Sequence, residues 1–127
     1  MSTILVIDDD KLICILLRQV LGHHGHEVLT TTSGTHGVEL FQKHRPKATV
    51  LDLRLPDVDG LAVLNEIRTL DPSASVIILT GAPNDDLLAK ARALGVTDVF
   101  YKGNSLHLLN QAIARLGTEG PSASASS

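Results

Sequence analysis

The sequence predicts an α/β domain in which a parallel five-stranded sheet is covered by helices on both faces. Short apolar runs alternate with longer amphipathic segments about five times along the chain. A repeated order of strand and helix requires parallel strands with right-handed crossovers, which place helices on both sides of the sheet. The 127 residues suffice for one compact domain with its own core. The expected architecture is therefore a doubly wound (βα)5 three-layer sandwich.

The predicted strands are short and rich in β-branched residues, as strands buried in a parallel sheet usually are. They are Ile4–Ile7, Glu27–Thr31, Ala48–Leu53, Ser75–Leu79 and Asp98–Tyr101. The second of these runs is the most polar, so we expect it to be a weaker, more exposed strand.

The segments between the strands carry apolar residues at helical spacing. They predict helices over Lys11–His23, Gly34–His44, Leu61–Leu70 and Asp85–Leu94, and a last helix marked by Leu106, Leu109, Ile113 and Leu116. Pro46 forbids continuation of the second helix, and Gly95 suits a left-handed cap at the end of the fourth. We expect residues 1–116 to form the domain and residues 117–127, which are small and polar, to form a flexible tail or linker.

The composition argues against several classes of function. The net charge of −3 and the low aromatic content, two Phe and one Tyr, disfavour direct binding of nucleic acid. No apolar stretch is long enough to span a membrane, and Asp8 arrives too early for a signal peptide. Cys14 is the single cysteine, so no internal disulfide can form, and its apolar surroundings indicate a buried, inert thiol. We therefore expect a cytoplasmic protein with no membrane contact.

Polar residues with chemical potential follow four of the predicted strands. Asp8–Asp10 follow the first strand, Asp52 ends the third, Thr80 closes the fourth and Lys102 follows the fifth. In open α/β sheets, ligands bind beyond the carboxyl ends of the strands, so the fold should bring these side chains to one edge.

Carboxylates gathered at one edge repel each other. At ~4 Å and an intermediate dielectric constant, each pair costs on the order of several kcal/mol. Protonation, a lysine or a divalent cation can relieve this repulsion. Hard oxygen ligands suit Mg²⁺ or Mn²⁺, and a site made cationic in this way would attract a phosphoryl group.

Four motifs in this order and spacing resemble the receiver domain of two-component response regulators, including the chemotaxis response regulator. They are residues 4–10 (ILVIDDD), 51–60 (LDLRLPDVDG), 79–82 (LTGA) and 101–102 (YK). The resemblance covers about residues 3–116. It implies a flavodoxin-like fold with strand order 2-1-3-4-5 and a phosphorelay function in signal transduction.

The resemblance assigns roles to individual residues. Asp52 matches the phospho-acceptor, a carboxylate that attacks the phosphorus of a donor phosphohistidine. Thr80 matches the hydroxyl that hydrogen-bonds a phosphoryl oxygen, and Lys102 its ion-pair partner. Besides its own phosphorylation and slow dephosphorylation, such a domain catalyses no reaction.

The metal ligands implied by the resemblance come from two segments. Asp9 would bind Mg²⁺ directly and Asp8 through water, while Asp52 and the backbone carbonyl of Arg54 would complete the protein ligands. Asp10 falls one position later and is better read as a helix N-cap.

The implied donor is a histidine kinase or a histidine phosphotransfer protein, and the implied target is an output domain or effector. A homodimer through the face formed by the last helix, strand and helix is a further candidate. The alternative function is a pseudo-receiver that binds partners without phosphorylation. A haloacid-dehalogenase-like phosphohydrolase would need a carboxylate at position 54, where this chain has Arg54, and no Gly-rich phosphate loop follows the first strand.

Departures from the family pattern lie around Lys102. Gly103 replaces the proline that usually follows this lysine in a cis peptide. Because a non-proline cis bond costs ~2.5–4 kcal/mol, we predict a trans Lys102–Gly103 bond. Val99 occupies the position of the usual aromatic switch residue. Tyr101 lies on the same face of the predicted strand, where packing is its simpler role.

Other polar residues need less specific explanations. Arg54 and Ala82 occupy positions that tune hydrolysis in the family; a long Arg54 over the site and a small Ala82 predict slow self-dephosphorylation. Asp57 and Asp59 suit local turns or caps. Residues 23–26 (HHGH) lack cysteine or carboxylate support for a metal, so we interpret them as a solvated helix end.

Overall fold

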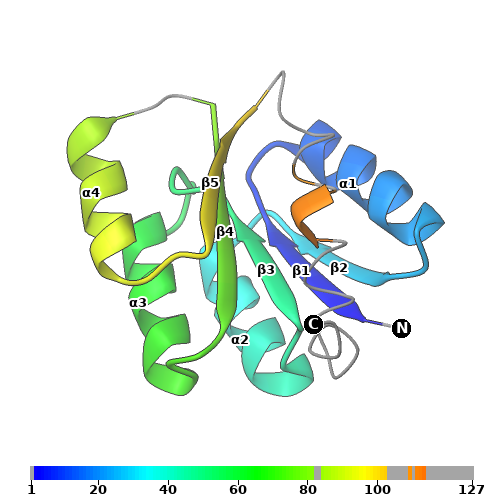
Figure 1. Ribbon diagram of the computed structural model, residues 1–127, viewed down its shortest axis with the longest axis horizontal. Helices are drawn as coiled ribbons and strands as arrows, with labels where there is room; N and C mark the ends of the chain where they lie inside the picture. The colour runs from blue at the N-terminus through cyan, green and yellow to red at the C-terminus, as the bar shows by residue number, and fades with distance from the viewer. Residues whose placement is uncertain (1, 82–83, 103–108, 110, 114–127) are drawn as a thin grey trace, which may run out of the picture.

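The computed structural model describes residues 2–81, 84–102, 109 and 111–113. It contains one parallel sheet of five strands in the order β2-β1-β3-β4-β5, with helices on both faces (Figure 1). This confirms the predicted fold class and the strand order that the resemblance implied.

The elements alternate along the chain as expected. The strands are β1 (Thr3–Ile7), β2 (Glu27–Thr31), β3 (Ala48–Leu51), β4 (Ser75–Thr80) and β5 (Asp98–Tyr101). The helices are α1 (Lys11–His23), α2 (Gly34–His44), α3 (Gly60–Leu70) and α4 (Asp85–Ala93). The predicted last helix, the domain boundary at residue 116, the tail, Ala82 and Gly103 lie wholly or mostly outside the described residues.

The prediction that the third strand reaches Leu53 was wrong, because the backbone leaves the sheet two residues earlier. The Arg54 amide turns back to donate to Oδ1 of Asp52, and the Gly60 amide donates to the carbonyl of Leu53. The loop of residues 52–59 therefore starts at Asp52 itself. β4, in contrast, runs to Thr80, because Thr80 still pairs with Tyr101 of β5.

Each of the four helices begins at a side chain that caps it. Asp10, Ser33, Asp59 and Asn84 each accept a hydrogen bond from a backbone amide two or three residues ahead. Such caps satisfy amides that have no partner inside the helix. Gly95 follows α4 with a φ of +82°, the left-handed conformation that its position predicts.

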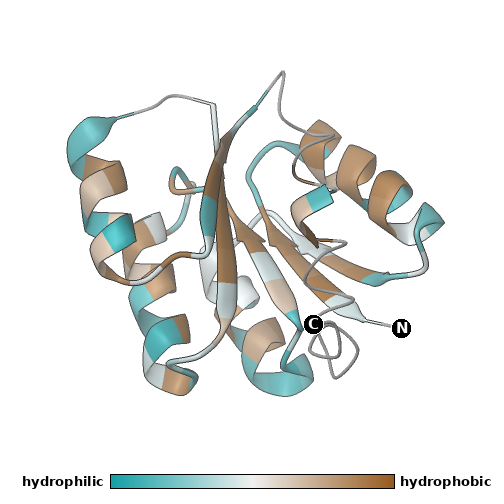
Figure 2. Ribbon diagram, in the orientation of Figure 1, coloured by the Kyte–Doolittle hydropathy of each residue, from teal (hydrophilic) through white to brown (hydrophobic). Residues whose placement is uncertain are grey.

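Two apolar layers hold the sheet in place. The alternating side chains of β1 divide between them: Ile4 and Val6 face α1, and Leu5 and Ile7 face α2, α3 and α4. The described residues Leu109 and Ile113 are buried in the α1 layer. Figure 2 shows the resulting concentration of apolar residues along the central strands.

The guanidinium group of Arg68 on α3 holds the C-terminal end of α4 in place by hydrogen bonds. Arg68 donates to the carbonyls of Leu94 and Gly95, which follow α4, and to that of Ala74 before β4, each at 2.6 Å. The carbonyls of Leu94 and Gly95 lie past the end of α4, where the helix offers them no amide partner, so Arg68 satisfies them. Within the described part of the chain, no helix has both the length and the apolar character needed to cross a membrane.

Gly60, the first residue of α3, lies against the backbone of the loop of residues 52–59. A Cβ at this position would overlap the backbone of Leu53, which no rotamer change can relieve. We expect Gly60→Ala to lower the free energy of unfolding by about 1–3 kcal/mol, as overpacking usually does. Urea denaturation measures this change.

Gly22 provides the control, since a Cβ there meets nothing within 4 Å inside α1. Gly22→Ala should be neutral or stabilise the protein by about 0.5–1 kcal/mol through helix propensity. Equal effects of the two substitutions would contradict this account of the loop.

Candidate functional site

The sheet itself places the polar residues at its carboxyl edge. Interstrand hydrogen bonds continue one residue past the strand ends, from the Asp52 amide to the carbonyl of Ile7 (2.8 Å) and from the Lys102 amide to that of Thr80 (2.8 Å). Residues from distant parts of the sequence are thus held in register by backbone contacts.

Lys102 bridges two buried carboxylates at this edge. Its Nζ lies 3.0 Å from Oδ1 of Asp8 and 3.1 Å from Oδ2 of Asp52. The side chains of Asp8 and Asp52 are only 1% and 4% exposed, and that of Lys102 is 18% exposed. Low exposure reduces solvent screening, so the cation offsets much of the repulsion between the two acids.

Backbone amides orient the same two carboxylates. The Asp10 amide donates to Oδ1 of Asp8 (2.9 Å), and the Arg54 amide donates to Oδ1 of Asp52 (3.0 Å). Oδ2 of Asp8 is buried and has no hydrogen-bond partner in the part of the chain that the structure describes. An unpartnered buried oxygen is costly, and an additional ligand at this edge would satisfy it.

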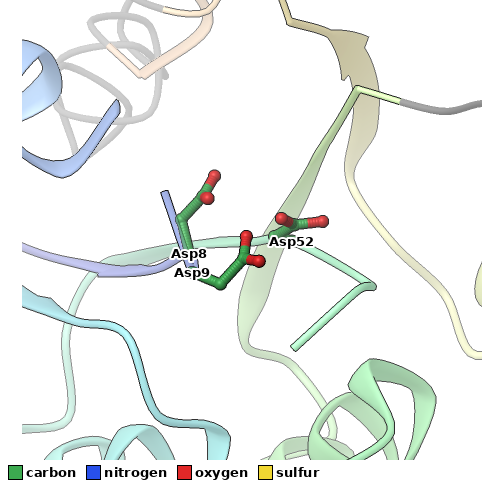
Figure 3. A group of neighbouring side chains, drawn as sticks. All are labelled: Asp8, Asp9 and Asp52. Carbon is green, nitrogen blue, oxygen red and sulfur yellow. The ribbon is translucent and has the colours of Figure 1, made fainter. Parts of the chain in front are cut away.

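The third carboxylate of the site belongs to Asp9, which is exposed. Figure 3 shows Asp8, Asp9 and Asp52 side by side, and one oxygen of each lies within 4.8 Å of the others. This is the only group of three or more such ligand residues among the described positions. An oxygen-only donor set that includes an unpartnered buried oxygen fits a hard divalent cation such as Mg²⁺.

Burial dominates the protonation behaviour of the site. Burial, with a smaller contribution from the charge of Asp52, raises the pKa of Asp8 to about 6, although hydrogen bonds from the Asp10 amide and Lys102 lower it. Burial alone would lower the pKa of Lys102, but hydrogen bonds and charges from both aspartates outweigh it and raise that pKa. Metal-free Asp8 therefore prefers to be neutral more strongly than an exposed aspartate.

The other residues expected at the site lie close to it in different environments. Thr80 is buried at the end of β4, whereas Arg54 is exposed on the loop after Asp52. Val99 packs into the apolar layer of α2, α3 and α4, and Tyr101 is 43% exposed. Cys14 lies beneath the edge, where its Sγ donates to the carbonyl of Asp8 at 3.4 Å and burial raises the thiol pKa.

Among the remaining polar residues, Asp10 and Asp59 have the predicted role, whereas Asp57 makes contacts that were not predicted. Asp10 and Asp59 are N-caps, as expected. The histidines of residues 23–26 form no ligand group with other described residues. Asp57 was predicted to serve a local turn or cap, but its carboxylate bonds to Ser33, Gly34 and Thr35 of another loop and helix. No sequence signal points to this contact, because its partners are more than twenty positions away.

Comparison with known proteins agrees with the site and the fold. The family model of the response regulator receiver domain matches residues 4–114. The chain is 28% identical to sporulation initiation phosphotransferase F of Bacillus subtilis over 112 residues, which cover 88% of this chain and 90% of that protein. It is 36% identical to the transcriptional regulatory protein AfsQ1 of Streptomyces coelicolor, where the match covers 99% of this chain but only 57% of AfsQ1.

A solved structure gives the same result in three dimensions. The response regulator receiver domain protein of Clostridium thermocellum superposes with a TM-score of 0.84 at 31% identity, covering 91% of this chain and 94% of that one. The family match covers most of the chain and includes the acidic edge and the five strands apart from Thr3, the first residue of β1. The chain therefore belongs to the response regulator receiver domain family of two-component systems.

Proposed function

We propose that this domain accepts a phosphoryl group on Asp52 from a phosphohistidine donor in a Mg²⁺-dependent reaction, and that the phosphorylated form switches a partner. The observation that carries the proposal is the ion-pair bridge: Lys102 joins Asp52 to Asp8, and Asp9 lies beside them. A nucleophile, a fixed cation and a set of metal ligands then share one edge of the sheet.

In the proposed reaction, a carboxylate oxygen of Asp52 forms a bond to phosphorus while the bond from phosphorus to the donor's imidazole nitrogen breaks. The Lys102 ammonium group would pair with the charge on the phosphoryl oxygens, and the Thr80 hydroxyl would donate a hydrogen bond to one of them. Hydrogen bonding by the Arg54 amide keeps the Asp52 carboxylate oriented before attack.

Asp8, Asp9, Asp52 and the backbone carbonyl of Arg54 are the groups that would hold Mg²⁺, and Mn²⁺ has the same ligand preference. When bound, the cation supplies positive charge that lets an anionic phosphoryl group approach an anionic nucleophile. The unpartnered Oδ2 of Asp8 supports this assignment, because the metal or its water would satisfy that atom.

The proposed donor is a histidine kinase or a histidine phosphotransfer protein. Helix α1 begins directly after Asp8–Asp10, the acidic residues that follow β1. On this helix, Leu12 is 62% exposed and Ile15 is 54% exposed, and both side chains suit contact with a protein donor. An output domain or a separate effector would read the change; the match covers 57% of the transcriptional regulatory protein AfsQ1 and 90% of sporulation initiation phosphotransferase F. Self-association through the last helix, strand and helix is a second route for output, and the proposed place of action is the cytoplasm.

Phosphorylation by a small-molecule donor separates this function from that of a pseudo-receiver. Acetyl phosphate with Mg²⁺ should add one phosphoryl group to the wild-type chain and none to Asp52→Asn, as intact mass spectrometry would show. Beryllofluoride should likewise shift NMR resonances at the edge only when Asp52 is present. Asp10→Asn is the control, because asparagine caps a helix as well as aspartate. Equal responses of the wild type and Asp52→Asn would leave the pseudo-receiver as the better function.

The burial of Asp8 makes the free energy of unfolding depend on pH. Its folded-state pKa of about 6 lies above the ordinary 3.8, so the folded protein loses stability as pH rises through this interval and the carboxylate ionises. In metal-free protein at pH 7, Asp8→Asn should therefore raise the free energy of unfolding by about 1–2 kcal/mol.

The difference between wild type and Asp8→Asn should shrink as the pH falls from 7 towards 4, because Asp8 of the folded protein becomes neutral below its pKa of about 6. Added MgCl₂ should stabilise the wild type more than the variant. Urea denaturation at both pH values, with EDTA or MgCl₂, measures these effects; a variant less stable than wild type in EDTA at pH 7 would refute the argument.

Arg54 is expected to set the lifetime of the phosphoryl group on Asp52. An arginine at position 54 can cover the site and pair with phosphoryl oxygens, which slows attack by water. Arg54→Ala should lose the group roughly severalfold faster once the donor is removed, because charge-assisted hydrogen bonds are lost. Arg92→Ala on α4 is the control. A slower loss from Arg54→Ala than from the wild type would contradict the hypothesis.

A further inference from the structure

We propose that Asp57 is a positioning residue for the phosphorylation site, which it serves by anchoring the loop of residues 52–59 to the first turn of α2. The inference rests on the proposed function and adds a residue outside the group that touches the phosphoryl group or the metal. It begins from the contacts of a single exposed carboxylate.

Asp57 binds three groups at the start of α2. Its Oδ1 accepts a hydrogen bond from the Gly34 amide (2.9 Å), and its Oδ2 accepts from the Ser33 hydroxyl (2.8 Å) and the Thr35 amide (3.2 Å). Ser33 in turn caps its own helix by accepting from the His36 amide. Two carboxylate oxygens from a distant loop therefore satisfy amides that a helix start leaves without partners.

The protonation of Asp57 reflects the strength of this arrangement. The hydrogen bond from the Gly34 amide, followed by that from Ser33, holds the pKa of Asp57 far below its usual range. The carboxylate therefore stays charged in the physiological pH range, and the anchor does not depend on pH there.

Apolar contacts reinforce the anchor beside Asp57. Gly34 is buried, and a Cβ at this position would overlap Val58 and Val63 and touch Leu55. The loop of residues 52–59 thus lies directly on the start of α2. The Asp57 carboxylate binds the first turn of the helix, and the side chains of Val58 and Leu55 pack against Gly34. A larger residue at position 34 would force these side chains to move.

The anchored loop is the segment that carries two parts of the site. It starts at Asp52, and its Arg54 amide orients that carboxylate. Arg54 also pairs with Asp59 in an antiparallel bridge, so the loop folds back on itself with Asp57 near its tip. Fixing the tip restrains the Arg54 carbonyl, which the proposed function uses as a metal ligand, without any contact between Asp57 and the metal.

The test compares Mg²⁺ affinity with stability in variants of the whole chain. In chemical-shift titrations with MgCl₂, Asp57→Ala should weaken binding about tenfold, the lower end of the effect seen when residues that orient metal ligands are removed. Asp57→Asn, which retains one acceptor oxygen, should recover part of the affinity. Ser33→Ala should weaken binding less in the Asp57→Ala background than in the wild type, because the two side chains act together.

Asp71→Ala is the matched control. Asp71 is also an aspartate that accepts hydrogen bonds within a turn, from the amide and hydroxyl of Ser73, but this turn lies between α3 and β4, at the opposite end of the sheet. It should leave Mg²⁺ affinity unchanged even where it lowers the free energy of unfolding as much as Asp57→Ala does.

The outcomes separate this inference from the proposed function. If wild-type protein shows no Mg²⁺-dependent beryllofluoride binding that requires Asp52, the proposed function fails. If the wild type shows that binding but Asp57→Ala and Asp71→Ala have the same Mg²⁺ affinity, Asp57 is only a stabilising cap and the positioning role is refuted.

Discussion

The site depends on one constraint: parallel strands paired in register end at the same edge of the sheet. β1, β3, β4 and β5 are neighbours in the order that the topology fixes, and their paired residues run to the last position of each strand. The residues that follow those strands are brought together by the backbone pairing of the sheet, before their side chains make any contact. Lys102 can bridge two acids because the sheet has already placed all three groups, and the ion pairs then stabilise an arrangement that backbone hydrogen bonds determine.

The acidic edge combines buried charge with an unsatisfied oxygen. Asp8 and Asp52 are nearly completely buried and Lys102 offsets their charge, while Oδ2 of Asp8 has no hydrogen-bond partner among the described residues. A fully satisfied network would be more stable but would have little reason to bind a cation. The apolar layers on both faces of the sheet support this local cost, since they bury the strand residues directly beneath the site.

Much of this structure follows from local sequence patterns. The strand and helix periods predict the element order and, for the described elements, the bounds to within two residues. The strand-end positions of Asp8, Asp52, Thr80 and Lys102 predict the site. The errors occur where tertiary contacts decide. β3 ends before Asp52 because a side chain captures the next turn. The role of Asp57 depends on a helix start more than twenty residues earlier, which no local pattern encodes. The burial that raises the pKa of Asp8 likewise appears only once all layers are packed.

The span of the Lys102–Asp8 contact has a consequence for biosynthesis. Its two ends are separated by 94 positions, nearly the whole length of the domain, whereas the acids are all present by residue 52. A nascent chain on the ribosome thus presents its carboxylates long before their cation has been translated. Under the proposed function, an encounter with a donor at that stage would be unproductive, because the edge is assembled only when β5 joins the sheet. Acceptance of a phosphoryl group would then require that the whole sheet has folded.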